Sequence, residues 1–294
     1  MDIDERVDAL LRSPVGCTFL HMADSTGLTP KKLAEPAVSL YLGAWASREI
    51  YVWSSNHQYV SQEVLRRGVE YTALARSILQ EPTAAWWFAP LDRENQIYTP
   101  REGAAPDPAK MVTPDGPPSR HERYEQQVFE GLFTSTLVHG LSSLFAALDL
   151  GTGDVGGGYP SPPLSSWHLK VAASARVLEI DGPQAWHDLC LAYPAEKTGD
   201  SNHPDFSGDA GQLVPDWSMV AAKWDAVHLG FGGLLTTQQV RVQSPAGWTY
   251  LWSWDAELTL WLRWMFISSE HLPDYEPPRP TPILRMGAID LLLR

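Results

Sequence analysis

Cysteine, basic residues and long apolar runs are all scarce in this chain. Cys17 and Cys190 are its only cysteines and neither forms a CxxC pair, which disfavours a disulfide framework or a thiolate zinc site and indicates a reducing compartment. Lys and Arg number 22 against 35 Asp and Glu, giving a net charge of −13, whereas an extended nucleic-acid partner needs clustered positive charge. No stretch reaches membrane-spanning length, and the acidic start "MDIDERVDALLRS" has no signal-peptide core. We therefore expect a cytoplasmic protein with neither a nucleic-acid nor a membrane partner.

Several motifs that would indicate a chemistry are missing or out of context. The nine histidines form no HxH, HxxxH or HExxH pattern, so we expect no metal site. No GxSxG segment supplies a serine nucleophile. Gly151, Gly153 and Gly156 do satisfy GxGxxG, but an expected helix precedes them and "YPSPP" follows. The dinucleotide motif needs the reverse order, a strand before and a helix after, so this segment is interpreted as a loop.

The composition is typical of a globular protein. Apolar residues make up 44% of the chain and thirteen residues are tryptophan, whose indoles build cores and flat binding walls. Helical spacing runs through residues 1–82, with Pro14, Gly27, Pro30 and Pro36 where helices would start or stop. The remainder, 83–294, mixes strands and helices, which predicts an α+β fold with a helical N-terminal region before a mixed, mostly antiparallel sheet domain. Pro- and Gly-rich loops are expected at 99–120, 151–166 and 194–215.

The second region divides into short expected elements. The run "AWWFAPLDRENQIYTP" is interpreted as a strand followed by a polar turn, and "WHLKVAASARVLEI" as one strand or a hairpin. Further strands are expected in "VFEGLFTSTLVHG", "AVHLGF" and "QQVRVQ". Helices are expected in "LSSLFAALDLG", in "QAWHDLCLAY" after Pro183, and in "DWSMVAAKW".

The segment "WSWDAELTLWLRWMF", residues 252–266, places two carboxylates among four tryptophans. Read with period two, one face is wholly apolar, from Trp254 and Ala256 onward. The other face carries Asp255, Glu257, Thr259, Trp261 and Arg263. We expect one long strand, whose polar face is either solvated or the wall of a cleft.

The segment "VFEGLFTST" resembles the central strand of ADP-ribosyltransferases of the Arg/Ser-Thr-Ser/Glu group, in which an aromatic residue and a glycine precede Ser-Thr-Ser. The resemblance implies the ADP-ribosyltransferase fold and NAD as substrate. By this resemblance, Ser135 and Thr136 would support the nicotinamide pocket, and Phe133 would be the aromatic residue that precedes them. Glu257 would be the catalytic acid, with Asp255 two positions earlier. An upstream Arg contacts the NAD phosphate in that family, and Arg93, 42 residues before Ser135, matches it. Trp261, on the expected face of Glu257, would form a stacking wall.

The chain also departs from the family pattern. It reads Thr-Ser-Thr and Asp-x-Glu, and 122 residues separate Ser135 from Glu257. Glu179, 44 residues after Ser135, is a rival for the acid, and Asp225 and His228 in "WDAVHL" are reserve candidates. The stretch 130–266 further resembles an uncharacterised group of actinobacterial proteins with segments such as "GLYTST" and "WDGVHLT".

These residues together predict an enzyme that transfers ADP-ribose from NAD to an unknown acceptor, a protein or a small molecule, or that hydrolyses NAD. A fixed carboxylate in a poorly hydrated cleft would stabilise the positive charge that develops on the ribose. Two alternatives stay open. A non-catalytic protein–protein interaction module would expose several tryptophans in one patch, and an enzyme of specialised metabolism would use the same acids on another aromatic substrate.

Overall fold

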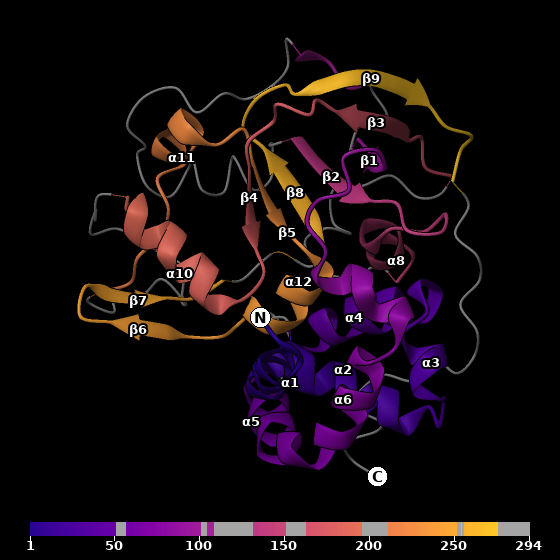
Figure 1. Cartoon of the computed structure of the whole chain (residues 1–294), viewed down its shortest axis with the longest axis vertical. Coiled ribbons are helices and arrows are strands. Elements are labelled where there is room, and N and C mark those ends of the chain that lie inside the picture. Colours follow the sequence, from indigo (N-terminus) through magenta and orange to yellow (C-terminus); the bar gives the residue numbers. More distant parts are fainter. Residues whose placement is uncertain are drawn as a thin grey trace.

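The computed structural model describes residues 1–50, 57–100, 105–108, 132–150, 163–195, 211–251, 254 and 256–275. Within them, a group of helices formed by the first part of the chain lies at one end of a mixed sheet and contacts the later helices α8 (Ser143–Asp149) and α12 (Phe231–Thr237) (Figure 1). The class is α+β, and the sheet is mostly antiparallel, as the sequence predicts. Most residues of the three expected loops lie outside the described ranges.

The N-terminal helices begin where the sequence supplies a cap. Asp2 accepts a hydrogen bond from the Glu5 amide at 2.9 Å and Glu5 accepts one from the Asp2 amide at 2.7 Å, which forms a capping box. Ser13 caps the next helix, and Pro14 follows at its first position. The elements of this region are α1 (Ile3–Arg12), α2 (Pro14–Ser25), α3 (Pro30–Leu33), α4 (Pro36–Ile50), α5 (His57–Arg67), η1 (Gly68–Tyr71) and α6 (Thr72–Leu79).

The described strands form a seven-stranded sheet in the order β4-β5-β8-β2-β1-β3-β9. Strands β4 and β5 pair in parallel and the other neighbours pair antiparallel. The strands are β1 (Gln96–Tyr98), β2 (Leu132–Thr136), β3 (Trp167–Val171), β4 (Val177–Ile180), β5 (Ala226–Leu229), β8 (Leu258–Trp261) and β9 (Phe266–His271), and β6 (Val242–Ser244) with β7 (Gly247–Thr249) forms a separate two-stranded sheet. The later helices are η2 (Pro82–Phe88), α8 (Ser143–Asp149), α10 (Pro183–Ala192), α11 (Trp217–Lys223) and α12 (Phe231–Thr237).

Three expected elements are wrong in detail. The aromatic run after Pro82 is the 3₁₀ helix η2, and a strand begins only at Gln96. Residues 167–180 form neither one strand nor a hairpin, because β3 pairs with β1 and β9 while β4 pairs with β5 at the opposite edge. The expected long strand at 252–266 is reduced to the four residues of β8, with β9 starting at Phe266.

Of the two alternatives for the polar face of that strand, a solvated face is absent from β8. All four of its residues are buried because β8 lies inside the sheet, with β5 on one side and β2 on the other, and both of its faces are covered. Because both faces of the strand are covered, the alternation of apolar and polar residues in its sequence does not mark a solvent-exposed face. Glu257, immediately before β8, is accordingly only 4% exposed.

Helix α12 is an element that the sequence did not predict. Its sequence, "FGGLLTT", contains two glycines, which disfavour helices. The glycines are explained by close packing, since a Cβ on Gly232 would meet the Phe88 ring at 2.4 Å and one on Gly233 would meet the Ile180 carbonyl oxygen at 2.0 Å. Tertiary contact therefore overrides the local propensity at this helix.

The hydrophobic core continues across the predicted boundary between residues 82 and 83. Phe19 of α2, Trp87 of η2 and Phe231 of α12 are all buried in one cluster. The ring centroids of Phe19 and Trp87 lie 5.4 Å apart and those of Trp87 and Phe231 lie 5.2 Å apart, both with edge-to-face geometry, which is favourable for aromatic pairs. The N-terminal helices thus pack directly on the segments that surround the sheet.

Replacing Gly233 with alanine tests this close packing. We expect Gly233→Ala to destabilise the fold by about 1–3 kcal/mol, despite the roughly 1 kcal/mol that alanine gains in helix propensity, because the Ile180 carbonyl is backbone and cannot yield cheaply. Gly182→Ala is the control, since its nearest neighbour is the Met1 side chain at 3.7 Å. Urea unfolding measures both, and equal stability of the two variants would contradict the packing argument.

Candidate functional site

Glu257 lies immediately before β8, where the sheet places it beside the Thr-Ser-Thr strand β2. Thr134 of β2 pairs with Thr259 of β8, and the two strands are antiparallel. Continuing this register brings Thr136 opposite Glu257. Ser135 and Glu257 are 122 positions apart in the sequence but adjacent in space, because two neighbouring central strands carry them to the same place.

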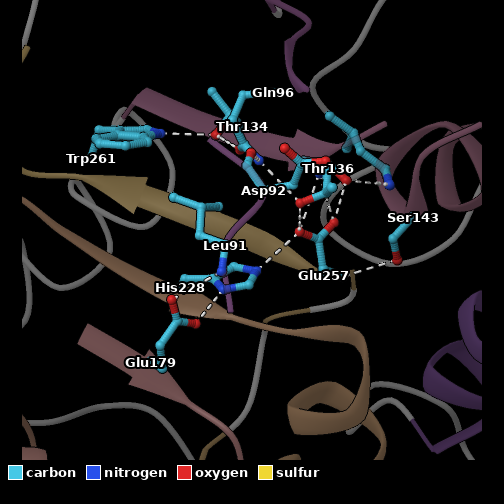
Figure 2. A network of polar contacts seen from close by, with 12 residues as sticks. Leu91, Asp92, Gln96, Thr134, Thr136, Ser143, Glu179, His228, Glu257 and Trp261 are labelled. Atoms are coloured by element: carbon cyan, nitrogen blue, oxygen red, sulfur yellow. Dashed lines mark hydrogen bonds and ion pairs between the residues drawn. The ribbon is translucent and has the colours of Figure 1, made fainter. Parts of the chain in front are cut away.

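The Glu257 carboxylate is held by several donors from β2. Ser135 Oγ donates to Oε2 at 2.7 Å and Thr136 Oγ1 donates to Oε1 at 2.8 Å (Figure 2). The Thr136 amide donates to the same carboxylate at 3.0 Å. The Glu257 amide in turn donates to Ser143 Oγ at 2.9 Å. Hydrogen bonds to an ionised acceptor are short and strong, and they fix the orientation of a buried carboxylate.

His228 of β5 connects Glu257 to a second carboxylate. Its Nε2 lies 3.2 Å from Glu257 Oε1 and its Nδ1 lies 2.5 Å from Glu179 Oε2 (Figure 2). The parallel pairing of β4 with β5 sets Glu179 beside His228. Glu179 Oε1 also accepts a hydrogen bond from the Leu91 amide at 3.0 Å. Both rival acids of the sequence, Glu179 and Glu257, therefore contact the same imidazole.

The two carboxylates control the charge of His228. Burial by itself would lower the pKa of this imidazole, but the hydrogen bonds and electrostatic attraction of Glu179 and Glu257 outweigh it and raise the pKa from the ordinary 6.5 to about 9. At neutral pH the side chain is therefore an imidazolium. The buried cation offsets much of the electrostatic cost of bringing two carboxylates close together.

A second chain of hydrogen bonds supports the Thr-Ser-Thr strand. The Trp261 indole donates to Thr134 Oγ1 at 2.8 Å, and Thr134 donates to Gln96 Oε1 at 2.5 Å. Gln96 Nε2 then donates to Thr136 Oγ1 at 3.0 Å. Because Thr136 itself contacts Glu257, this chain links strands β1, β2 and β8 to the carboxylate.

A pocket of about 300 Å³ opens at Glu257. Two aromatic side chains contribute to it, Trp86 of η2 and Phe231 of α12, with ring centroids 4.9 Å apart and planes inclined by 32°. Among the described residues that line it there is no Lys or Arg. The lining residues are Trp86, Ala89, Pro90, Asp92, Thr136, Leu137, Val138, His139, His228, Gly230, Phe231 and Glu257.

The predicted site residues divide into two groups. Ser135, Thr136 and Glu257 meet at one point. Arg93 does not join them, because its guanidinium donates to the carbonyl oxygens of Ala172 and Ala175, both at 2.9 Å. This arginine holds a turn of the chain rather than facing the pocket.

The two predicted aromatic residues also lie away from the pocket. Trp261 is 1% exposed and packs against Phe266, with ring centroids 4.6 Å apart, so it offers no stacking surface to a ligand. Phe133 packs edge-to-face on Trp254 at 6.2 Å. Neither contributes to the pocket lining. Asp255 lies outside the described residues.

Of the reserve candidates, His228 is central and Asp225 is structural. Burial would raise the pKa of Asp225, but hydrogen bonds from Arg176 and the charges of Arg176 and Arg263 lower it overall. Asp225 accepts from the Arg176 amide at 2.8 Å and from Arg263 Nη1 at 3.2 Å. These bonds join the start of β4 to the end of β8.

Several residues of the site were not identified from the sequence. Trp86 and Asp92 belong to the run that was interpreted as a strand and turn, and Gln96 and Ser143 carried no motif. The position of His139 was the easiest of these to find, because a His-Gly pair between two apolar segments is typical of a tight turn. Val138 and Leu141 exchange backbone hydrogen bonds of 2.7 and 3.1 Å across that turn.

His139 is in an unusual backbone conformation. Its φ is +52° and that of Gly140 is +82°, so both central residues of the turn are left-handed, where asparagine and glycine are the favoured residues. A histidine there costs conformational energy at the pocket wall. Residues held in sparsely populated conformations are often found at functional sites.

We expect His139→Asn to stabilise the protein by about 0.5 kcal/mol, because asparagine adopts positive φ more readily. His271→Asn, at an exposed position of β9 with ordinary strand backbone, is the control and should give no gain. Thermal or urea unfolding measures the difference. A loss of stability in His139→Asn would show that the histidine side chain makes a contact worth more than the backbone cost.

The charge of His228 predicts how stability depends on pH. Its folded pKa of about 9 lies above the ordinary 6.5, so its contribution is fully present below about pH 6.5 and is lost as pH rises through about 9. We expect the free energy of unfolding to fall over this range in the wild type and in His271→Asn. In His228→Asn the free energy of unfolding should already be lower at about pH 6.5, and it should change less as the pH rises. An unchanged pH slope in His228→Asn would contradict the assignment.

Metal-binding clusters, membrane-spanning helices and similarity to known proteins also bear on the function of the site. The part of the chain that the structure describes contains no group of three or more His, Cys, Asp or Glu side chains that could hold a metal ion. None of its helices is long and apolar enough to span a membrane. Comparison of the chain with models of protein families, with curated proteins and with solved structures finds no match. Support for a function comes from the contacts of Glu257 and the pocket around it.

Proposed function

We propose that this protein cleaves the bond between nicotinamide and ribose in NAD, and transfers the ADP-ribose to an acceptor or to water. The observation that carries the proposal is the Glu257 carboxylate, held by Ser135 and Thr136 at the wall of a pocket. In the ADP-ribosyltransferases that "VFEGLFTST" resembles, a polar strand acts together with a late glutamate. Here the polar strand β2 is the neighbour of β8, which Glu257 directly precedes.

The position of Glu257 suits the chemistry of the reaction. Cleavage of the glycosidic bond leaves positive charge on the ribose, and a carboxylate stabilises that charge best when it is already oriented and shielded from water. Glu257 is 4% exposed and its two oxygens accept hydrogen bonds from three groups of β2. Little reorganisation is then needed as the charge develops.

The pocket walls suit a flat aromatic ring with a positive charge. Trp86 and Phe231 offer apolar surfaces, and no Lys or Arg among the described lining residues would repel a pyridinium. A volume of about 300 Å³ is at the lower end for small-molecule sites. The pocket would hold the nicotinamide end of NAD, with the adenosine end outside it.

The phosphates of NAD have no assigned partner. Arg93, which the resemblance makes the phosphate contact, uses its guanidinium on the carbonyls of Ala172 and Ala175. The proposal therefore rests on the carboxylate and the ring pocket, and the acceptor, a protein or a small molecule, is unassigned. An enzyme of specialised metabolism acting on another aromatic ring would use the same groups.

The interaction-module alternative receives no such support. It expects several tryptophans in one exposed patch, and none of the tryptophans whose burial is described is exposed. Trp53 and Trp252 lie outside the described side chains. The indoles mainly fill the core, as Trp87, Trp254 and Trp261 do.

The test is release of nicotinamide from NAD by the purified full-length protein, with and without candidate acceptors. We expect Glu257→Gln to lower turnover by at least about 100-fold, because the neutral amide cannot stabilise the ribose cation, and Ser135→Ala to lower it by about 10-fold. Glu270→Gln, an exposed substitution of the same type on β9, should keep full turnover. Circular dichroism checks that each variant folds.

Two outcomes would contradict the proposal. Turnover by Glu257→Gln equal to that of wild type would remove the carboxylate from the chemistry. If wild type neither binds nor cleaves NAD, with or without acceptors, the pocket serves another aromatic substrate.

A further inference from the structure

His228 lies between two carboxylates in a way that restricts its chemistry. Glu179 Oε2 is 2.5 Å from Nδ1 and Glu257 Oε1 is 3.2 Å from Nε2. The side chain is 3% exposed, so water does not compete for either nitrogen. An ionised carboxylate can only accept hydrogen bonds, and a neutral imidazole has one donor, so both contacts are satisfied together only by the doubly protonated ring.

This arrangement rules His228 out as a proton acceptor. A ring that donates from both nitrogens has no lone pair left for a substrate. With the imidazolium at +1, the three side chains together carry one negative charge rather than two. The central cation lies between two carboxylates that would otherwise repel each other.

Glu179 is held by a backbone amide as well as by the ring. Its Oε1 accepts the Leu91 amide at 3.0 Å, and Leu91 lies between the pocket residues Pro90 and Asp92. Glu179 itself does not line the pocket, whereas Glu257 does. The chain from the pocket wall through Glu179 and His228 ends on the oxygen of Glu257 that also accepts Thr136 Oγ1.

We propose that Glu179 and His228 form a positioning pair for Glu257. Glu179 holds the imidazole in place and His228 holds the Glu257 carboxylate turned to the pocket, where Glu257 acts on the ligand. This proposal rests on the proposed function for its effect on turnover. The protonation of His228 can be measured on the protein alone.

The other groups that face His228 do not supply the same charge. The neighbouring strand β8 contributes Thr259, which does not titrate, and Gly230 follows on the same chain. Across the pocket lie Asp92 and His139, both exposed. Glu179 on β4 and Glu257 before β8 are the described carboxylates within hydrogen-bonding distance of the ring.

The first arm of the test is NMR of the full-length protein labelled with ¹⁵N at histidine. Long-range ¹H–¹⁵N spectra distinguish a doubly protonated ring from either neutral tautomer, and the signal missing from His228→Asn assigns the residue among the nine histidines. We expect both nitrogens of His228 to be protonated at pH 7.5 in wild type. A neutral ring at that pH would overturn the proposal, whatever the protein does with NAD.

The second arm is the pH profile of NAD cleavage in Glu179→Gln. Without Glu179 the ring should lose its proton at lower pH, so we expect kcat to fall by about 10-fold at pH 8 and by less than about 2-fold at pH 6, with KM little changed. Glu179→Asp, which keeps the charge, should restore most of the loss at pH 8. Glu270→Gln is the matched exposed control.

The outcomes separate this proposal from the proposed function. Loss of turnover in Glu179→Gln by the same factor at every pH would reduce Glu179 to a structural role and overturn the pair. Wild type without NAD cleavage would overturn the proposed function, and the NMR arm would still decide the state of His228. A doubly protonated His228 together with a shifted pH profile supports both.

Discussion

A buried carboxylate must be given partners, and the structure around Glu257 is organised by that requirement. Moving an ionised carboxylate out of water costs several kcal/mol even after relaxation. Hydrogen bonds to a charged group are worth about 1.5–3 kcal/mol each, so a group of them is needed to offset the cost. Ser135, Thr136 and His228 provide these bonds from strands on either side of β8. The arrangement holds only if three segments distant in sequence keep their register.

The central place of β8 in the sheet provides this register. Its neighbours are β2 on one side and β5 on the other, and antiparallel pairing fixes which residues lie opposite each other. A slip of one residue would reverse the face of every side chain on the moved strand. The same pairing that buries Leu258 and Leu260 therefore also aims Thr136 and His228 at Glu257. Fold stability and site geometry depend on the same contacts.

The sequence allowed the chemistry-bearing residues to be recognised better than their surroundings. Ser135, Thr136 and Glu257 could be proposed together because a resemblance supplied their order, and the structure brings them into contact. Period two also placed Trp261 on the face of Glu257, but four strand residues span roughly 13 Å, so it lies at the other end of β8. Arg93 could not be placed because the carbonyls that bind it come from residues about 80 positions away. Glu179 and His228 were named as a rival and a reserve candidate, but the sequence did not relate them to each other, since they meet only through the β4–β5 pairing.

The pocket walls depend on tertiary packing that no local pattern encodes. Phe231 and Trp86 belong to α12 and η2, an unpredicted helix and a run misread as a strand. Both segments rest on the N-terminal helices, because Phe19 of α2 packs against Trp87 and Phe231. Residues of the predicted helical region, which do not line the pocket, thus support the side chains that do. The helical region and the sheet therefore act together on the site, since a shift of α2 would be transmitted by packed rings to the wall facing Glu257.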